Sequence, residues 1–157
     1  MKYLFVILSL VVLICTRCSS GKSATSNINV QQLLNSRNYT FVAQYAQPLG
    51  GRQIPLTTEY TLTVKGDSLV SYLPYFGQAY VAPINTSDVG LEFTSTQFDY
   101  YITANRKGSY DINIKPKEQA KASQLTLSVT SGGYANLQVL SNNRQAINFR
   151  GVMRAAK

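Results

Sequence analysis

The feature that most constrains the fold of this chain is a regular alternation of apolar and polar side chains. Segment 57–65 shows it most clearly, because Tyr60, Leu62 and Val64 would share one face of an extended strand and the residues between them are polar. A period of two is typical of an antiparallel strand with one buried face and one face in water. The pattern recurs along most of the chain after Tyr39, so the sequence predicts a mainly β domain.

Turn-forming residues divide the alternating segments into short strands. Gly66-Asp67, Gly132-Gly133 and segment 141–144 each lie between two such segments, and glycine, asparagine and aspartate are favoured in tight turns. The pattern indicates about eight strands that pair as an antiparallel meander. The sheet has to bury its apolar face, and the sequence leaves open whether it curls into a barrel-like or a sandwich-like arrangement.

A short helix is expected before the first strand, over residues 27–37. The apolar residues of this segment form a partial helical stripe, and either Asn27 or Asn29 could be its N-cap. Residues 27–157 are then expected to form a single β-rich domain, because about 130 residues are enough to bury a substantial core.

The N-terminus has the pattern of an export signal. Lys2 precedes a run of 12 mostly apolar residues, 3–14. This run is shorter than the roughly 20 residues that a membrane-spanning helix needs, and it fits the apolar core of a secretory signal. We therefore predict that residues 1–17 are a signal peptide and that the protein is exported.

The segment that begins at Cys18 reads Cys-Ser-Ser-Gly-Lys and resembles the start of a mature bacterial lipoprotein, in which the cysteine carries the lipid. Residues 18–26 are small and polar and are predicted to be a flexible tether. Arg17 stands where lipoproteins usually have a small residue. The alternatives are therefore ordinary cleavage after Gly21 and an uncleaved anchor.

The composition argues against most kinds of catalysis. The chain has no histidine, and its only cysteines, Cys15 and Cys18, lie at the edge of the signal. Catalytic triads, thiolate nucleophiles and His- or Cys-based zinc sites are therefore excluded from the domain. Glycoside hydrolysis needs two suitably spaced carboxylates. Glu59, Asp99 and Asp111 are the only plausible set, and the alternation places them on solvated faces. We expect no enzymatic activity, no metal and no cofactor.

The net charge of the chain is +8, but the basic residues are scattered rather than clustered. Scattered charge is typical of a solvated surface, and export removes the protein from most nucleic acid. The expected partners therefore include no nucleic acid. They include a membrane, reached through the N-terminal lipid, whose anionic headgroups would attract a basic domain.

One segment, 73–83, breaks the alternation. Proline is disfavoured in central strands, so this segment is expected to be a loop, an edge or a bulged strand. It could be an aromatic binding platform, or it could be a plug over an open end of the core, which is the simpler interpretation. The loop that contains Gly50-Gly51-Arg52 is a second candidate rim. The candidate binding or plug residues of segment 73–83 are Pro74, Tyr75, Phe76, Gly77 and Tyr80.

At this segment the chain resembles domain of unknown function family 4251. The run Leu-Pro-Tyr-Phe-Gly at 73–77 resembles the family's signature, and supporting matches lie at 48–51, at 66–69 and at 141–147 with Gly151. The resemblance extends from about Asn27 to Met153. It implies a shared fold and an exported protein of the kind found in Bacteroidota, often with a lipoprotein-like signal. The family has no established function, so the resemblance supplies no catalytic residues.

These observations favour a non-catalytic protein of the cell envelope, anchored by lipid, that acts as a binding or accessory domain for an unknown protein, glycan or lipid. Its expected location is the outer membrane, facing the periplasm, and secretion as a soluble protein is the alternative. A second hypothesis is a periplasmic carrier that holds a lipid or another hydrophobic ligand inside a curved sheet, which would require an open apolar cavity. A glycan hydrolase is the third and least favoured hypothesis.

Overall fold

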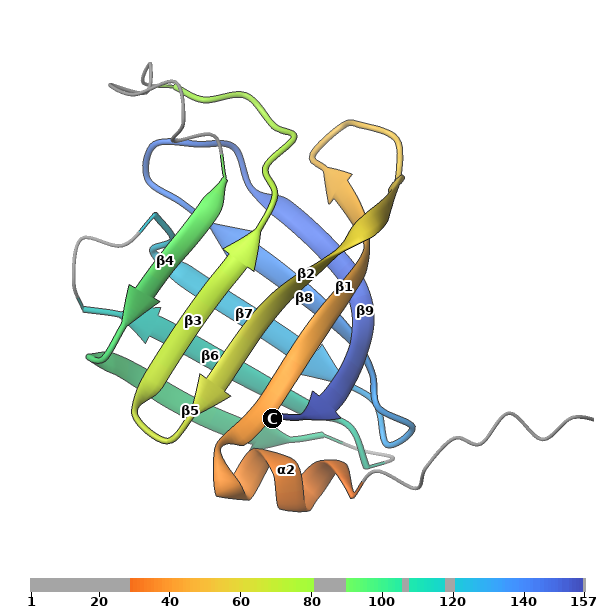
Figure 1. Cartoon of the computed structure of the whole chain (residues 1–157), viewed down its shortest axis with the longest axis vertical. Coiled ribbons are helices and arrows are strands. Elements are labelled where there is room, and N and C mark those ends of the chain that lie inside the picture. The colour runs from red at the N-terminus through yellow and green to blue at the C-terminus, as the bar shows by residue number, and fades with distance from the viewer. Residues whose placement is uncertain (1–28, 81–89, 106–107, 118–120, 157) are drawn as a thin grey trace, which may run out of the picture.

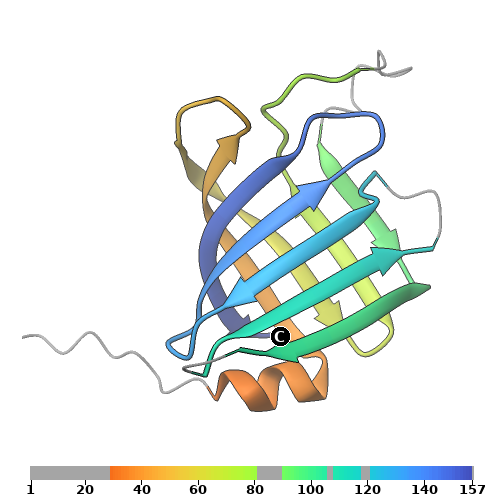
Figure 2. The same cartoon turned by 180° about the vertical axis from the view of Figure 1, so that it is seen from behind.

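The computed structural model describes residues 29–80, 90–105, 108–117 and 121–156. The predicted signal peptide, Cys18 and the predicted tether lie outside the described residues. In the described part, nine strands form one antiparallel sheet that curls into a nearly closed barrel, with one short helix (Figure 1, Figure 2). The predicted class is confirmed, with nine strands rather than about eight. The strands are β1 (Asn38–Pro48), β2 (Ile54–Lys65), β3 (Ser68–Leu73), β4 (Leu91–Ser95), β5 (Phe98–Ala104), β6 (Tyr110–Pro116), β7 (Gln124–Val129), β8 (Tyr134–Leu140) and β9 (Ile147–Ala155).

The pairing of the first strand with the last one turns two meanders into a single sheet. The strand order is β4-β3-β2-β1-β9-β8-β7-β6-β5, so only β1 and β9 are neighbours that are not consecutive in sequence. Their pairing extends from Tyr39 opposite Ala155 to Pro48 opposite Ile147. The two edge strands, β4 and β5, are joined by residues 96–97 alone. In the part of the chain that the structure describes, the wall of the barrel is therefore open along the seam between β4 and β5.

The alternation of the sequence sorts side chains between the inside and the outside of the barrel. Leu62, Val64, Leu125 and Leu127 are 0% exposed, as their positions in the pattern predict. Tyr60 is half-buried at the edge of the core and stacks on Tyr72, with 5.6 Å between ring centroids. The predicted inward face is thus confirmed for the aliphatic residues, and Tyr60 lies at its margin.

Helix α2 (Val30–Ser36) lies across one end of the barrel (Figure 1). Asn29 caps it, since its side-chain oxygen accepts a hydrogen bond from the Gln32 amide at 3.1 Å. Val30 and Leu34 are buried against the sheet. The helix therefore covers the core at this end. No helix in the described ranges is long and apolar enough to cross a membrane.

Tyr39, just after the helix, pairs with Tyr100 of β5. The Arg37 guanidinium lies 4.7 Å from the centre of the Tyr100 ring, and the hydroxyls of Tyr100 and Tyr39 are 3.1 Å apart. Burial raises the pKa of Tyr39 well above its usual value. The pair therefore gives the buried hydroxyl of Tyr39 a hydrogen-bond partner within the core.

A bulge interrupts β1 in the middle of its pairing with β9. The register between the two strands shifts between Ala43 and Tyr45, so that Gln44 has no opposite residue. Gly151 of β9 lies against this point, and a Cβ atom there would overlap the carbonyl oxygen of Val42. A bulge bends a strand and re-aims its side chains. Here Gln44 and Tyr45, although consecutive, are both exposed.

Candidate functional site

The aromatic segment after β3 lies at the end of the barrel opposite α2, beside the turn between β8 and β9 (Figure 1). Ala79 forms an isolated antiparallel bridge with Arg144. The Tyr80 amide donates to the Asn143 carbonyl at 2.8 Å, and the Gln145 amide donates to the Gln78 carbonyl at 2.9 Å. Two segments far apart in the sequence are therefore joined at this rim.

Tyr75 forms the centre of that junction. Its hydroxyl lies 2.8 Å from the Gln78 carbonyl oxygen and 2.9 Å from that of Gln145, and the Arg144 guanidinium is 5.2 Å from the centre of its ring. Partial burial raises its pKa. A Cβ atom at Gly77 would overlap the Tyr75 hydroxyl, which gives a steric reason for glycine at that position.

The other candidate residues of the segment face outward. Phe76 is 43% exposed and Tyr80 is 68% exposed, while Pro74 is half-buried. Tyr75 is thus the aromatic residue of this segment that packs against the core, and Phe76 and Tyr80 leave aromatic surface in solvent. A shallow hollow of about 450 Å³ separates Phe76 from the loop that contains Gly50-Gly51-Arg52, so the two candidate rims of the sequence lie together.

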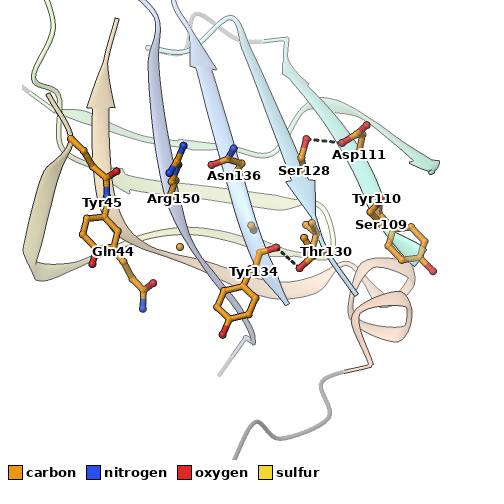
Figure 3. Close-up of a pocket in the computed structure, with 14 residues that line it drawn as sticks. Gln44, Tyr45, Ser109, Tyr110, Asp111, Ser128, Thr130, Tyr134, Asn136 and Arg150 are labelled. Atoms are coloured by element: carbon orange, nitrogen blue, oxygen red, sulfur yellow. Dashed lines mark hydrogen bonds between the residues drawn. The ribbon is translucent and has the colours of Figure 1, made fainter. Parts of the chain in front are cut away.

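A larger groove lies on the outer face of the sheet, at the bulge, and the sequence analysis did not identify it. Its volume is about 530 Å³, within the range of ligand-binding clefts. Its residues come from β1, β9, β8, β7 and β6, and from the loops beside them (Figure 3). The lining residues are Gln44, Tyr45, Gln53, Ser109, Tyr110, Asp111, Ser128, Val129, Thr130, Tyr134, Ala135, Asn136, Arg150 and Gly151.

A row of polar side chains crosses the groove, one from each strand. In the sheet register Asp111 is opposite Ser128, Ser128 is opposite Asn136, and Asn136 is opposite Arg150. Arg150 is in turn opposite Tyr45, beside the bulge. Side chains at opposite positions of neighbouring strands lie on the same face, so the register places all of these on one continuous surface.

The two ends of this polar row differ in how firmly they are held. The Asp111 carboxylate accepts hydrogen bonds from the Ser128 hydroxyl at 2.6 Å and from the side-chain Nδ2 of Asn105 at 2.5 Å. The side chains of Arg150, Asn136 and Gln44 have no hydrogen-bond or ion-pair partner within the described residues. Asp111 is therefore oriented in advance, and the other end has free hydrogen-bonding capacity.

Tyrosine rings lie along one side of the polar row. Figure 3 shows Tyr45 at one end, Tyr110 at the other and Tyr134 between them. Tyr45 is 41% exposed and Tyr134 is 66% exposed, while Tyr110 is half-buried. A tyrosine ring offers rigid apolar area together with a polar hydroxyl, so the groove combines flat apolar surface with hydrogen-bonding groups.

The carboxylates that could have supported hydrolysis are not gathered in this groove. Glu59 forms an ion pair with Arg154 at 3.6 Å, and Asp99 forms one with Lys117 at 2.8 Å. Asp111 is opposite Thr103 in the register. Asp99 is therefore four residues away along β5, about 13 Å at the rise of a strand. The described residues hold no group of three or more potential metal ligands.

Comparison with known proteins identifies a family and a fold. The model of the family described as domain of unknown function DUF4251 matches residues 21–153. A crystal structure of a DUF4251 family protein from Bacteroides eggerthii DSM 20697 is similar, with a TM-score of 0.61 and 18% identity over 84% of this chain and 89% of that one. At this identity the likeness concerns the fold alone. No curated protein matches the chain.

Proposed function

This chain belongs to the DUF4251 family, a domain of unknown function, and on that premise we propose that it is a non-catalytic envelope protein that binds its ligand on the outer face of the barrel. The observation that carries the proposal is the groove at the bulge, where exposed tyrosine rings lie beside polar side chains that have no hydrogen-bond partner among the described residues. Free hydrogen-bonding groups beside aromatic surface are typical of ligand sites.

The filled interior of the barrel argues against the carrier hypothesis, and therefore favours a ligand that binds on the outer surface. Side chains that line a cavity large enough for an acyl chain would keep accessible surface. Tyr39, Phe41, Leu62, Leu127 and Phe149 keep none, at 0% exposure. Large side chains in contact with one another fill the space that a hydrophobic ligand would need.

A non-catalytic role agrees with the separation of the acidic residues. The distance of about 13 Å along the strand between Asp99 and Asp111 exceeds the roughly 5–10 Å that glycosidases use. The Asp99 carboxylate is held in an ion pair with Lys117, and the Asp111 carboxylate accepts two hydrogen bonds that orient it at one end of the groove.

We further propose that the protein is exported and anchored in the outer membrane by a lipid on Cys18, facing the periplasm. The chain enters the described domain at Asn29, next to α2. Eleven residues lie between Cys18 and Val30, and the twelve residue-to-residue steps limit the reach of this segment to about 40 Å. An anchor at this end leaves the wall of the barrel and the opposite rim uncovered. Without the lipid, the same domain would be secreted in soluble form.

The lipid anchor makes a direct prediction. Cells that produce the full chain and are fed an alkyne fatty acid should label the wild-type protein, and Cys18→Ser should remove the label. A single acyl chain binds membranes only weakly, so stable retention requires the several chains of a mature lipoprotein. An unlabelled wild-type protein whose N-terminus is Lys22 would show ordinary cleavage instead.

The binding surface is tested by photo-crosslinking in intact cells. A photoreactive amino acid at position 134 of the full chain should form adducts with envelope material, because this side chain lies in the groove. The same amino acid at position 101 is the matched control, since Tyr101 is 60% exposed and lies outside the groove. Equal adducts at both positions, or none at position 134, would rule out the groove as the binding surface.

A further inference from the structure

We propose that the outer groove binds a neutral glycan, a short chain of uncharged sugar rings. The inference rests on the proposed function, since it names the ligand class of the same groove. It follows from three properties of the lining: flat apolar rings, hydrogen-bonding groups of both kinds and balanced charge.

The aromatic part of the groove suits the face of a sugar ring. A pyranose presents a patch of C–H groups on each face, and such a patch packs against the flat surface of an aromatic ring. Tyr45 and Tyr134 offer exposed rings on the same side of the polar row (Figure 3). Their hydroxyls remain available at the edge of that apolar surface.

The polar part of the groove suits sugar hydroxyls, each of which both donates and accepts hydrogen bonds. Asp111 only accepts, Arg150 only donates, and Gln44, Gln53 and Asn136 do both. A phosphate or sulfate would use the donors and be repelled by Asp111. An acyl chain would leave all of these groups unpaired, which is costly when water is displaced.

The balanced charge of the lining also favours a neutral ligand. Its charged side chains are one arginine, Arg150, and one aspartate, Asp111. The basic excess of the whole chain, +8, is therefore not concentrated here. A strongly charged ligand of either sign would find one attractive group and one repulsive group, whereas a neutral ligand could use both.

The position of the groove on the sheet argues against an extended peptide. Peptides that add to a sheet need an edge strand with unpaired backbone groups. The groove lies over β1, β9, β8, β7 and β6, and each of these strands is paired on both sides. The ligand can therefore contact only side chains in this groove, and side chains are sufficient to bind the hydroxyl groups of a sugar.

The span of the groove fits several sugar units. Four interstrand spacings separate β1 from β6 through β9, β8 and β7, which is about 19 Å across the sheet. The tyrosines and the polar row follow this direction (Figure 3). A short oligosaccharide lying across the strands could stack on the tyrosines and reach both Asp111 and Arg150.

The test is calorimetric titration of the purified full chain in detergent with neutral tetrasaccharides. The probes are maltotetraose, cellotetraose, mannotetraose and chitotetraose, together with a heparin tetrasaccharide and inorganic phosphate as charged probes. At least one neutral probe should bind, and both charged probes should bind more weakly. Tyr134→Ala and Asn136→Ala should each raise the Kd for that neutral probe about tenfold, which is the scale of one lost stacking or hydrogen-bond contact.

Two control variants separate specific binding from general effects. Tyr101→Ala removes a similarly exposed tyrosine outside the groove and should leave the Kd for the sugar within about twofold of the wild-type value. Tyr134→Phe keeps the ring and should retain most of the affinity. Binding of the charged probes alone, binding of no neutral probe, or equal losses in Tyr101→Ala and Tyr134→Ala would each overturn the glycan assignment.

The glycan assignment and the proposed function can fail separately. Crosslinks at position 134 in cells, together with no binding of neutral tetrasaccharides, would overturn the glycan ligand and leave the groove as a binding surface. Absence of both crosslinks and binding would remove the groove from the function altogether.

Discussion

Replacement of Gly151 by alanine is expected to destabilise the protein by about 3 kcal/mol or more, as overpacking of a tight backbone contact does. The added Cβ would overlap the carbonyl oxygen of Val42 and lie 2.8 Å from its carbonyl carbon. These are backbone atoms of a strand paired on both sides, so they cannot move aside as a flexible side chain would. Urea unfolding followed by circular dichroism measures the loss.

Gly132→Ala is the matched control for this experiment. A Cβ atom there would meet only the Tyr134 ring, at an ordinary contact distance of 3.7 Å. We expect the free energy of unfolding to change by less than about 0.5 kcal/mol, as for most surface substitutions. A loss for Gly151→Ala as small as that for Gly132→Ala would show that the pairing of β1 with β9 is looser at this point than the structure indicates.

Gly151 also links the fold to the candidate site. It lines the outer groove and lies where the register of β1 shifts. The bulge that this close approach permits directs both Gln44 and Tyr45 outward, into the groove. A change at this glycine should therefore disturb binding as well as stability, whereas Tyr134→Ala should affect binding alone.

Truncation of the barrel interior should have an effect of similar size. Leu62→Ala and Leu127→Ala are each expected to lower the free energy of unfolding by about 2–5 kcal/mol, the range for buried leucines. Both side chains are 0% exposed and belong to the same core. Their cost has two parts, the lost burial of apolar atoms and the cavity that remains.

Leu49→Ala is the control of the same residue type. Leu49 lies in the loop at the rim and is 60% exposed, so its truncation should cost less than about 0.5 kcal/mol. If Leu62→Ala and Leu127→Ala were as mild as Leu49→Ala, the barrel interior would be loosely packed. The lipid-carrier hypothesis would then regain support.

Local features of the fold could be read from the sequence because they depend on neighbouring residues. The period of two at 57–65 determines which side chains of β2 face inward. Asn29 is an N-cap because its short polar side chain reaches the first turn of the helix that follows it. Gly66, with a φ of 59°, adopts the turn conformation that a tight hairpin requires. Each of these choices is made within a few residues.

The sequence did not reveal the groove because each of its polar residues is ordinary on its own strand. Ser128, Asn136 and Arg150 occupy alternate positions that a strand normally exposes to water. They become neighbours only through the registers of β7 with β8 and of β8 with β9. A pattern with a period of two states which face a residue occupies, and it does not state which residue lies beside it.

The sequence by itself therefore determined the elements of this protein, its mainly β class and the separation of its apolar and polar faces, because these follow from local stereochemistry and hydrophobicity. Only the tertiary structure decided the barrel closure, the bulge and the groove. The pairing of β1 with β9 brings Ala43 opposite Gly151, more than 100 residues later in the chain. Such a contact depends on long-range register and on steric fit between two backbones, which no local pattern encodes.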